Sequence, residues 1–259
     1  MRFRNLGSGS GGNATLVEAS QGITTTRILV DAGFSERELL RRLAIAGHGA
    51  ADIDAIFITH EHGDHVGRSL AFARRHRIPL ITSRGTWRAM GCDDFDASLL
   101  RLARSGETIA LGDLELQPFA VPHDALEPLQ LCVSDGAVRL GIVTDLGSAP
   151  QAVANALAGC RGLLLECNHD EAMLRAGPYP PALQRRILGS HGHLSNVAAA
   201  ELLGRCLHPA LGAVVAAHLS EKNNSPDLAR AALAPVLNCA VADIRVADPA
   251  LGFGWVELD

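Results

Sequence analysis

Three features are absent from this sequence, and each absence excludes a class of protein. The six cysteines, at positions 92, 132, 160, 167, 206 and 239, include no CxxC pair, which argues against a disulfide framework and against a thiolate metal site. No apolar run approaches the roughly 20 residues that cross a bilayer. The first residues, MRFRNLGSGSGGN, have no apolar segment of the kind that a secretory signal requires. We therefore expect buried thiols, a cytoplasmic location and no membrane partner.

The sequence also has little excess charge of either sign. Its net charge is −5 and its pI is about 6.1, so the protein as a whole is not a cationic nucleic-acid binder. Basic residues cluster locally at 74–77 and 185–186, which we interpret as solvated helix faces. No low-complexity tract or linker divides the 259 residues, so we predict a single domain over residues 1–259. Nothing in the sequence favours a particular oligomeric state.

Apolar runs rich in valine, isoleucine and leucine alternate with helical patterns along the whole chain. The predicted strands are Arg2–Leu6, Ala14–Glu18, Arg27–Val30, Ala55–Thr59, Pro79–Thr82, Glu107–Leu111, Leu114–Ala120, Leu129–Val133, Arg139–Val143, Gly162–Glu166, Ala213–Ala217, Asp243–Val246 and Gly254–Glu257. The predicted helices are Ser35–Ala46, Val66–Arg75, Arg84–Met90, Pro150–Ala158, Asp170–Arg175, Tyr179–Leu188, Leu194–Cys206 and Ser225–Val236. This pattern predicts an α/β (α+β) fold with two sheets, or one split sheet, covered by helices on the outer faces.

A dense cluster of polar side chains follows the predicted strand Ala55–Thr59. The segment His60-Glu61-His62-Gly63-Asp64-His65 offers four candidate metal ligands within six residues. In an extended segment His60 and His62 point to the same side. A turn eased by Gly63 then brings Asp64 and His65 to a second metal, before a helix that starts at Val66. Imidazole and carboxylate ligands suit Zn²⁺, and also Mn²⁺ or Fe.

Six residues cannot complete two metal sites, so further ligands must come from later strand ends. His123 follows the strand Leu114–Ala120, Asp145 follows Arg139–Val143, and His218 follows Ala213–Ala217. Each by itself reads as an ordinary loop residue. Together with the first cluster, they predict a metal centre at the edge where the strand ends meet.

The order HxHxDH, His, Asp, His resembles the metallo-β-lactamase superfamily, and the resemblance covers essentially the whole chain. It implies a four-layer αββα sandwich, with two mixed β-sheets flanked by helices and two divalent metal ions at one edge. The residues that the resemblance assigns to metal are His60, His62 and His123 for the first ion, Asp64, His65 and His218 for the second, and Asp145 as the bridge. Asp31, in ILVDAG, matches a family position that supports the site from behind.

Later segments resemble one branch of this superfamily. SGSGGNATLVEA, the stretch LECNHDEAML to GSHGHLSNVAAAELL, and AAHLSEKNNSPDLA are similar to the YycJ (WalJ) branch, whose members are described as 5′-to-3′ exonucleases on double-stranded DNA. The layout is also similar to that of tRNA 3′-processing endonucleases, which pair a glutamate at a strand end with a later histidine. By this resemblance Glu166 orients His193 beside the metals. A role in DNA repair would follow from the resemblance alone.

Phosphodiester chemistry explains why such a pair is needed. A hydroxide bridging two metals about 3.5–4 Å apart attacks phosphorus at neutral pH, because the metals lower the pKa of bound water. The departing sugar oxygen still needs a proton, which a histidine held protonated by a carboxylate supplies. We therefore predict Asp64, Glu166 and His193 as catalytic residues. The alternative is structural: Glu166 in a salt bridge and His193 at a helix start.

Several polar residues are candidates for substrate contact, each with an equally plain structural alternative. The loop Ser8–Asn13, which contains the candidates Ser10 and Asn13, offers backbone N–H groups to an anion or is an ordinary turn. His169 contacts phosphate or caps a helix. Asn223 and Asn224 bind nucleotide or backbone carbonyls.

We therefore predict a binuclear metal-dependent phosphodiesterase acting on nucleic acid, with DNA as the favoured substrate and 5′-to-3′ exonuclease activity. The alternative is a small-molecule hydrolase of the same fold that cleaves a thioester, a lactone or a cyclic phosphodiester. The negative net charge favours the alternative, whereas Glu166 and His193 favour the nuclease.

Overall fold

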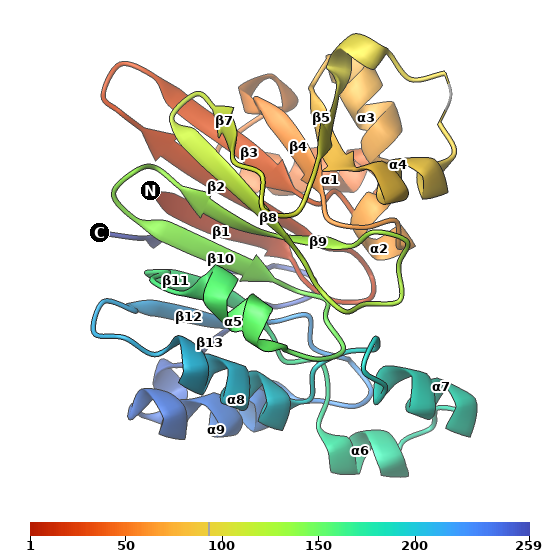
Figure 1. Ribbon diagram of the computed structural model, residues 1–259, viewed down its shortest axis with the longest axis vertical. Coiled ribbons are helices and arrows are strands. Elements are labelled where there is room, and N and C mark those ends of the chain that lie inside the picture. Colours follow the sequence, from red (N-terminus) through yellow and green to blue (C-terminus); the bar gives the residue numbers. More distant parts are fainter. Residues whose placement is uncertain (93) are drawn as a thin grey trace.

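The computed structural model describes residues 1–92 and 94–259, whose strands form two seven-stranded sheets packed face to face (Figure 1). The first sheet has the order β14-β1-β2-β3-β4-β5-β6, with β1 (Arg2–Gly7), β2 (Ala14–Ser20), β3 (Thr25–Val30), β4 (Ala55–Ile58), β5 (Leu80–Ser83), β6 (Leu100–Ala103) and β14 (Val256–Glu257). The second has the order β13-β12-β11-β10-β9-β8-β7, with β7 (Ile109–Leu111), β8 (Leu114–Ala120), β9 (Leu129–Ser134), β10 (Arg139–Val143), β11 (Gly162–Glu166), β12 (Ala213–Ala217) and β13 (Arg245–Val246).

Both sheets are mixed in the same way. The strands β14, β1, β2 and β3 are antiparallel, and β3 to β6 are parallel. The strands β7 to β10 are antiparallel, and β10 to β13 are parallel. Because parallel strands end at the same edge, the loops after β4, β10, β11 and β12 can converge on one site.

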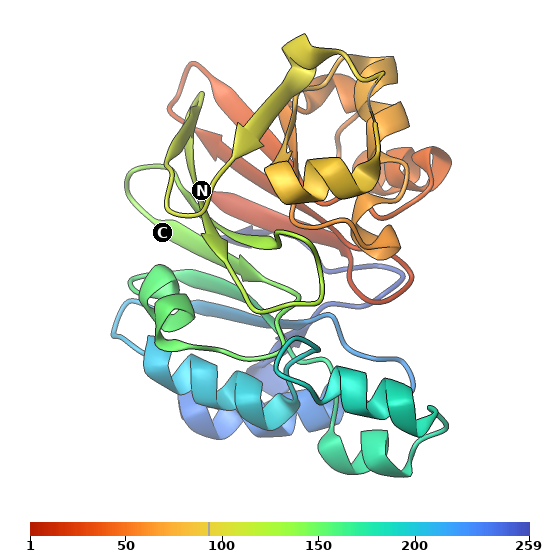
Figure 2. The same ribbon diagram turned by 45° about the vertical axis from the view of Figure 1, so that its right-hand side comes forward.

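Helices cover the outer face of each sheet (Figures 1 and 2). Those beside the first sheet are α1 (Glu36–Ile45), α2 (Gly63–Val66), α3 (Ser69–His76) and α4 (Arg84–Met90), with the 3₁₀ turns Ala50–Asp52 and Ala97–Leu99. Those on the second are α5 (Gln151–Leu157), α8 (Asn196–Cys206) and α9 (Pro226–Leu237), with the 3₁₀ turn Val241–Asp243. The short helices α6 (Glu171–Ala176) and α7 (Pro181–Ile187) project beyond the second sheet.

Three apolar layers hold this arrangement together. Strand β4 is fully buried and shows the principle: Phe57 points into the layer between the sheets, whereas Ile56 and Ile58 point into the layer beneath the helices of the first sheet. A third layer, which includes Leu163 and Leu203, lies between the second sheet and its helices. The predicted αββα sandwich with two mixed sheets is confirmed.

Two local predictions differ from the structure. The predicted helix Val66–Arg75 is two helices, α2 and α3, because Gly67 interrupts it with φ 47° and ψ −116°. Asp64 and His65 therefore lie inside α2 rather than in a turn before a helix at Val66. The edge strand β6 was not predicted at all.

Four of the six cysteines, Cys132, Cys160, Cys167 and Cys206, are buried as expected, whereas Cys92 is partly exposed and Cys239 is exposed. Within the described ranges, no helix has the length and hydropathy that a membrane span requires.

Candidate metal centre and active site

Seven histidine and aspartate side chains from both sheets meet at the edge where the parallel strands end. The elements that carry them are the loop after β4 with α2, and the loops after β8, β10 and β12. Their ligand atoms form overlapping groups in which every atom lies within 4.8 Å of the others, and these groups include His60, His62, Asp64, His65, His123, Asp145 and His218. The structure thus brings together all seven residues that the sequence suggested as ligands.

The first group consists of His60, His62 and His123. The rings of His60 and His62 lie 4.6 Å apart between centroids, and those of His60 and His123 lie 4.9 Å apart. His62 donates Nε2–H to the carbonyl of Asp124 at 3.2 Å, and His123 donates Nδ1–H to the carbonyl of Gly192 at 2.9 Å. The second nitrogen of each ring is therefore left with its lone pair, as a metal ligand requires.

The second group consists of Asp64, His65 and His218. His65 donates Nδ1–H to Asp31 Oδ2 at 2.8 Å, and its Nε2 lies 3.4 Å from Asp64 Oδ2. His218 places Nε2 at 3.4 Å from the same carboxylate oxygen, while its Nδ1 lies 3.1 Å from Glu166 Oε1. One nitrogen of each ring again faces an oxygen acceptor and the other faces the cluster.

Asp145 lies between the two groups and is 1% exposed. Its Oδ2 is 3.0 Å from His65 Nε2, and its Oδ1 is 3.3 Å from His218 Nδ1 and 3.8 Å from His123 Nε2. Burial alone would raise the pKa of Asp145, but the surrounding histidines, His218 and His65 foremost, hold it well below its usual range. The carboxylate is thus ionised and within reach of both groups.

Two buried atoms in this cluster have no hydrogen-bond partner, namely His60 Nε2 and Asp145 Oδ2. Asp145 Oδ2 lies close to His65 Nε2, yet the two atoms do not align as a hydrogen bond. Burying such atoms unsatisfied is costly unless another group binds them. With imidazole and carboxylate donors, the cluster fits divalent metal.

Glu166 ends β11 and is fully buried, and it holds His193 in place. Its Oε1 accepts a hydrogen bond from His193 Nδ1 at 2.7 Å, and its Oε2 accepts from the backbone N–H groups of Leu146 and Leu194 at 3.1 and 3.0 Å. Burial alone would lower the pKa of His193, but Glu166, and then Asp145, raise it above its usual value. Glu166 also contacts His218, and this second contact was not predicted from the sequence.

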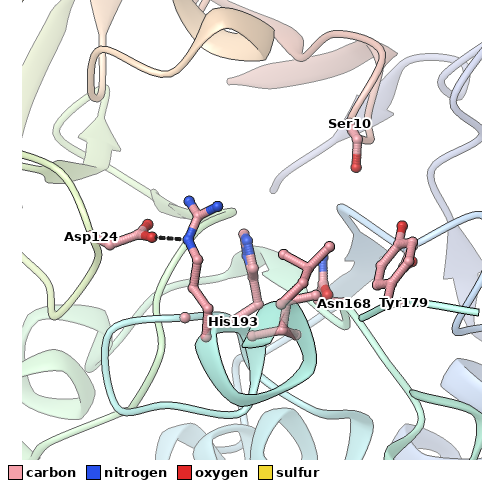
Figure 3. Close-up of a pocket in the computed structure, with 10 residues that line it drawn as sticks. Ser10, Asp124, Asn168, Tyr179 and His193 are labelled. Atoms are coloured by element: carbon pink, nitrogen blue, oxygen red, sulfur yellow. Dashed lines mark hydrogen bonds and ion pairs between the residues drawn. The ribbon is translucent and has the colours of Figure 1, made fainter. Parts of the chain in front are cut away.

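A pocket of about 170 Å³ opens beside His193 (Figure 3). Its lining comes from the loop Ser8–Asn13, from α7 and the segments on either side of it, and from the loops after β8, β11 and β12. The lining residues are Ser10, Asp124, Asn168, Tyr179, Leu183, Arg186, Ile187, Gly192, His193 and Ser220. Asp124 and Tyr179 lie on opposite sides of it, and Ser10 lies across the opening (Figure 3). Arg186 forms an ion pair with Asp124.

Of the ten lining residues, the sequence had suggested only Ser10 and His193. Three of the other eight carry polar or aromatic groups that bear on substrate binding. Arg186 belongs to a dibasic pair that was interpreted as a solvated helix face. Asp124 directly follows the candidate ligand His123, which was a signal that could have been used. Tyr179 stands in GPYPP, a proline-rich segment that nothing in the sequence places next to the metals.

Of the candidate substrate residues, Ser10 is exposed and lines the pocket, whereas the three asparagines are buried and form hydrogen bonds, with Asn223 Oδ1 alone left without a partner among their side-chain atoms. Asn13 donates to Asp64 Oδ2 at 3.2 Å and accepts from Gly9 N at 2.9 Å. Asn224 donates to the Cys167 carbonyl at 2.7 Å, and Asn223 Nδ2 contacts Ser220 Oγ at 3.2 Å. The contacts favour the structural alternative, because these side chains brace the ligand-bearing loops.

His169 is 1% exposed and both of its ring nitrogens lack a hydrogen-bond partner. Burial lowers its pKa, which favours the neutral ring. It does not cap α6, since Asp170 accepts the hydrogen bond from Met173 N.

The fold and the site define the class of protein. A family model for the beta-lactamase superfamily domain matches residues 26–218. The chain belongs to the metallo-β-lactamase superfamily, and it is a metal-dependent hydrolase of that fold.

Relatives narrow the branch. The chain is 34% identical over 249 residues to exodeoxyribonuclease WalJ of Streptococcus pneumoniae serotype 2, and the aligned residues cover 95% of this chain and 90% of that protein. It is 32% identical over 239 residues to exodeoxyribonuclease YycJ of Bacillus anthracis, and the aligned residues cover 92% of this chain and 89% of that protein. The metallo-β-lactamase fold protein YhfI from Bacillus subtilis superposes with a TM-score of 0.73 at 17% identity, covering 98% of each chain. The predicted superfamily and the resemblance to the YycJ (WalJ) branch are confirmed.

Proposed function

We propose that the chain is a DNA exonuclease that degrades duplex DNA from the 5′ end with two bound divalent metal ions. The observation that carries this proposal is the pairing of Glu166 with His193 at 2.7 Å, directly beside the histidine and aspartate cluster. The names of the two relatives, both exodeoxyribonucleases, support DNA as the substrate.

In this proposal two groups of residues hold the metals. His60, His62 and His123 hold one ion, Asp64, His65 and His218 hold the other, and Asp145 reaches both. When bound, divalent metals such as Zn²⁺ or Mn²⁺ neutralise charge on the phosphate and activate water. Asp64 contributes as a ligand, and its carboxylate is fixed by Asn13.

His193 acts as the acid that protonates the departing sugar oxygen. Its Nδ1–H is held by Glu166, and it is 20% exposed on its side chain, so the ring is open to the pocket. Glu166 keeps the ring charged and fixes its orientation, and the backbone N–H groups of Leu146 and Leu194 fix Glu166 in turn. A positioned acid of this kind contributes about 10²–10⁴-fold in rate.

The test is a time course on linear duplex DNA labelled at its 5′ ends, with Mn²⁺ and with Zn²⁺ supplied in turn. We expect short labelled products to appear at once, while a covalently closed circle of the same DNA stays intact because it has no end. Cleavage of the circle would contradict exonuclease action, and no cleavage of either DNA with metal bound would contradict nuclease action.

A small-molecule hydrolase is the second candidate, because the net charge of −5 opposes a polyanionic substrate. It would cleave a thioester, a lactone or a cyclic phosphodiester with the same cluster. This candidate gains if such substrates are hydrolysed by protein that leaves DNA intact.

A further inference from the structure

The one tyrosine and the one lysine of the chain lie against each other at the pocket beside His193. Tyr179 lines the pocket, and Lys222 Nζ lies 5.8 Å from the centroid of its ring. The other nine aromatic residues, seven phenylalanines and two tryptophans, all pack in or against the three apolar layers. Tyr179 is therefore the aromatic ring that the fold does not use for its core.

Tyr179 is held on a stiff segment. Pro178 precedes it, Pro180 and Pro181 follow it, and Gln184 Nε2 donates to its carbonyl at 3.0 Å. Proline fixes its own φ and restricts the residue before it, so a ring presented here loses little freedom when it is covered. The side chain remains half-buried, and it lines the pocket (Figure 3).

Lys222 is exposed, but the loop that carries it is anchored. The carbonyl of Asn223 accepts from Asp170 N at 2.9 Å, and Asn224 is bonded to the Cys167 carbonyl. The loop follows the candidate ligand His218 by only a few residues, and Ser220 in the same loop lines the pocket. On the far side of the pocket Arg186 provides a second cation, partly neutralised by Asp124.

We propose that Tyr179 is a stacking platform for one nucleobase of the strand that is cleaved, and that Lys222 contacts the phosphate of that nucleotide. This inference rests on the proposed nuclease function and deepens it. The pocket of about 170 Å³ is sized for a single group, and an aromatic ring with an ammonium group 5.8 Å from its centroid matches a base next to its phosphate. Stacking tolerates every base, as an enzyme that removes successive nucleotides requires.

The test measures binding, so that it does not depend on turnover. A labelled single-stranded octamer with phosphorothioate linkages, which resist cleavage, is titrated with metal-loaded wild-type protein, with Tyr179→Leu and with Tyr179→Phe, and fluorescence anisotropy gives each affinity. We expect Tyr179→Leu to weaken binding about 5- to 150-fold, the change that corresponds to one stacked base, and Tyr179→Phe to keep wild-type affinity.

An abasic nucleotide moved through the octamer identifies the stacked base. At one position it should weaken wild-type binding by the same factor and have no effect on Tyr179→Leu, because the partner ring is already gone. Equal affinity of wild type and Tyr179→Leu for the intact strand would overturn the inference, and so would an abasic penalty that persists in Tyr179→Leu.

Lys222 is tested by the salt dependence of the same titration. Lys222→Gln should make the slope of log affinity against log salt shallower by about 0.7, the value for one phosphate contact on a single strand. The matched control, Arg75→Gln on α3, removes the same charge from a side chain that is 71% exposed and should leave the slope unchanged. Equal slopes for Lys222→Gln and wild type would overturn its assignment.

The two proposals fail separately. Protein that binds the octamer as described but cleaves no DNA with Mn²⁺ or Zn²⁺ would keep the subsite and lose the nuclease function. Protein that cleaves DNA, with Tyr179→Leu binding as wild type does, would keep the function and lose the subsite.

Discussion

Asp31 shows how a single residue can act on the cluster without belonging to it. It is 3% exposed, sits at φ 60°, and accepts hydrogen bonds from His65 Nδ1 at 2.8 Å and from Thr59 N at 2.9 Å. Because Nδ1–H of His65 is held by Asp31, the lone pair of that ring lies on Nε2, toward Asp64 and Asp145.

Asp31→Asn should lower metal affinity about 10- to 100-fold, since the amide keeps the shape but no longer holds His65 with a charge. The measurement is a titration of metal-free protein with Zn²⁺, followed by metal content per chain. Asp113→Asn is the control, because Asp113 is also buried and bonded to hydroxyls, those of Thr24 and Thr26, away from the cluster. Unchanged affinity in Asp31→Asn would contradict this role.

At the residue scale, the sequence predicted which side chains at strand ends belong to the site. It did not predict contacts between residues that lie far apart in the chain. His123, Asp145 and His218 each follow an apolar strand, and strand ends meet at an edge by rule. The sequence could not predict the position of the Asn13 side chain, because this side chain is held by hydrogen bonds to Asp64, 51 positions later in the chain. The pairing of Tyr179 with Lys222 likewise depends on how α6 and α7 fold back.

Among the helices and strands, α2 matters most to the cluster, because it carries both Asp64 and His65. The turn at its end requires a glycine, Gly67. Gly67 has φ 47°, and a Cβ there would lie 2.5 Å from the Ala32 carbonyl oxygen and 2.6 Å from the Gly33 carbonyl carbon. Gly63, the glycine inside the ligand motif, has open space at its Cβ position. The required glycine is thus Gly67 rather than Gly63.

Gly67→Ala should displace α2, which carries Asp64 and His65, and should therefore reduce the metal content per chain. It should also lower the free energy of unfolding by roughly 1–3 kcal/mol. Gly63→Ala should leave both unchanged or slightly improved, because alanine is the better helix former. Urea unfolding and metal analysis of the two variants check this. Equal behaviour of the two variants would show that the turn after α2 is not constrained.

Helices and strands were predicted correctly where the hydrophobic pattern was long. The predictions were wrong where a single glycine or a very short strand departed from that pattern. β8, β10, β11 and β12 have the predicted bounds, because apolar runs flanked by polar residues mark buried strands. The helix break at Gly67 comes from a backbone conformation that periodicity cannot report. β6 was missed because it is a four-residue edge strand, Leu-Arg-Leu-Ala, without β-branched side chains.

For the whole molecule, the net charge of −5 opposes a polyanionic substrate, so attraction must be local. Lys222 and Arg186 beside the pocket are two cations able to meet phosphates, in addition to bound metal.

With two such contacts, kcat/KM on duplex DNA should fall about 10-fold or more between about 50 and about 200 mM salt, since each contact releases counterions. Initial rates over a salt series, at fixed metal concentration, provide the measurement. A flat response would favour a small uncharged substrate.

The central claim is that His193, held by Glu166, is the acid of a metal-dependent phosphodiesterase. The most direct measurement compares wild type with His193→Ala on end-labelled duplex DNA, with metal content determined on the same samples. We predict a loss of about 10²–10⁴-fold in cleavage rate with metal content unchanged, and no loss in His191→Ala, an exposed histidine two residues earlier. Full activity in His193→Ala, or loss of activity only together with metal, would contradict the account.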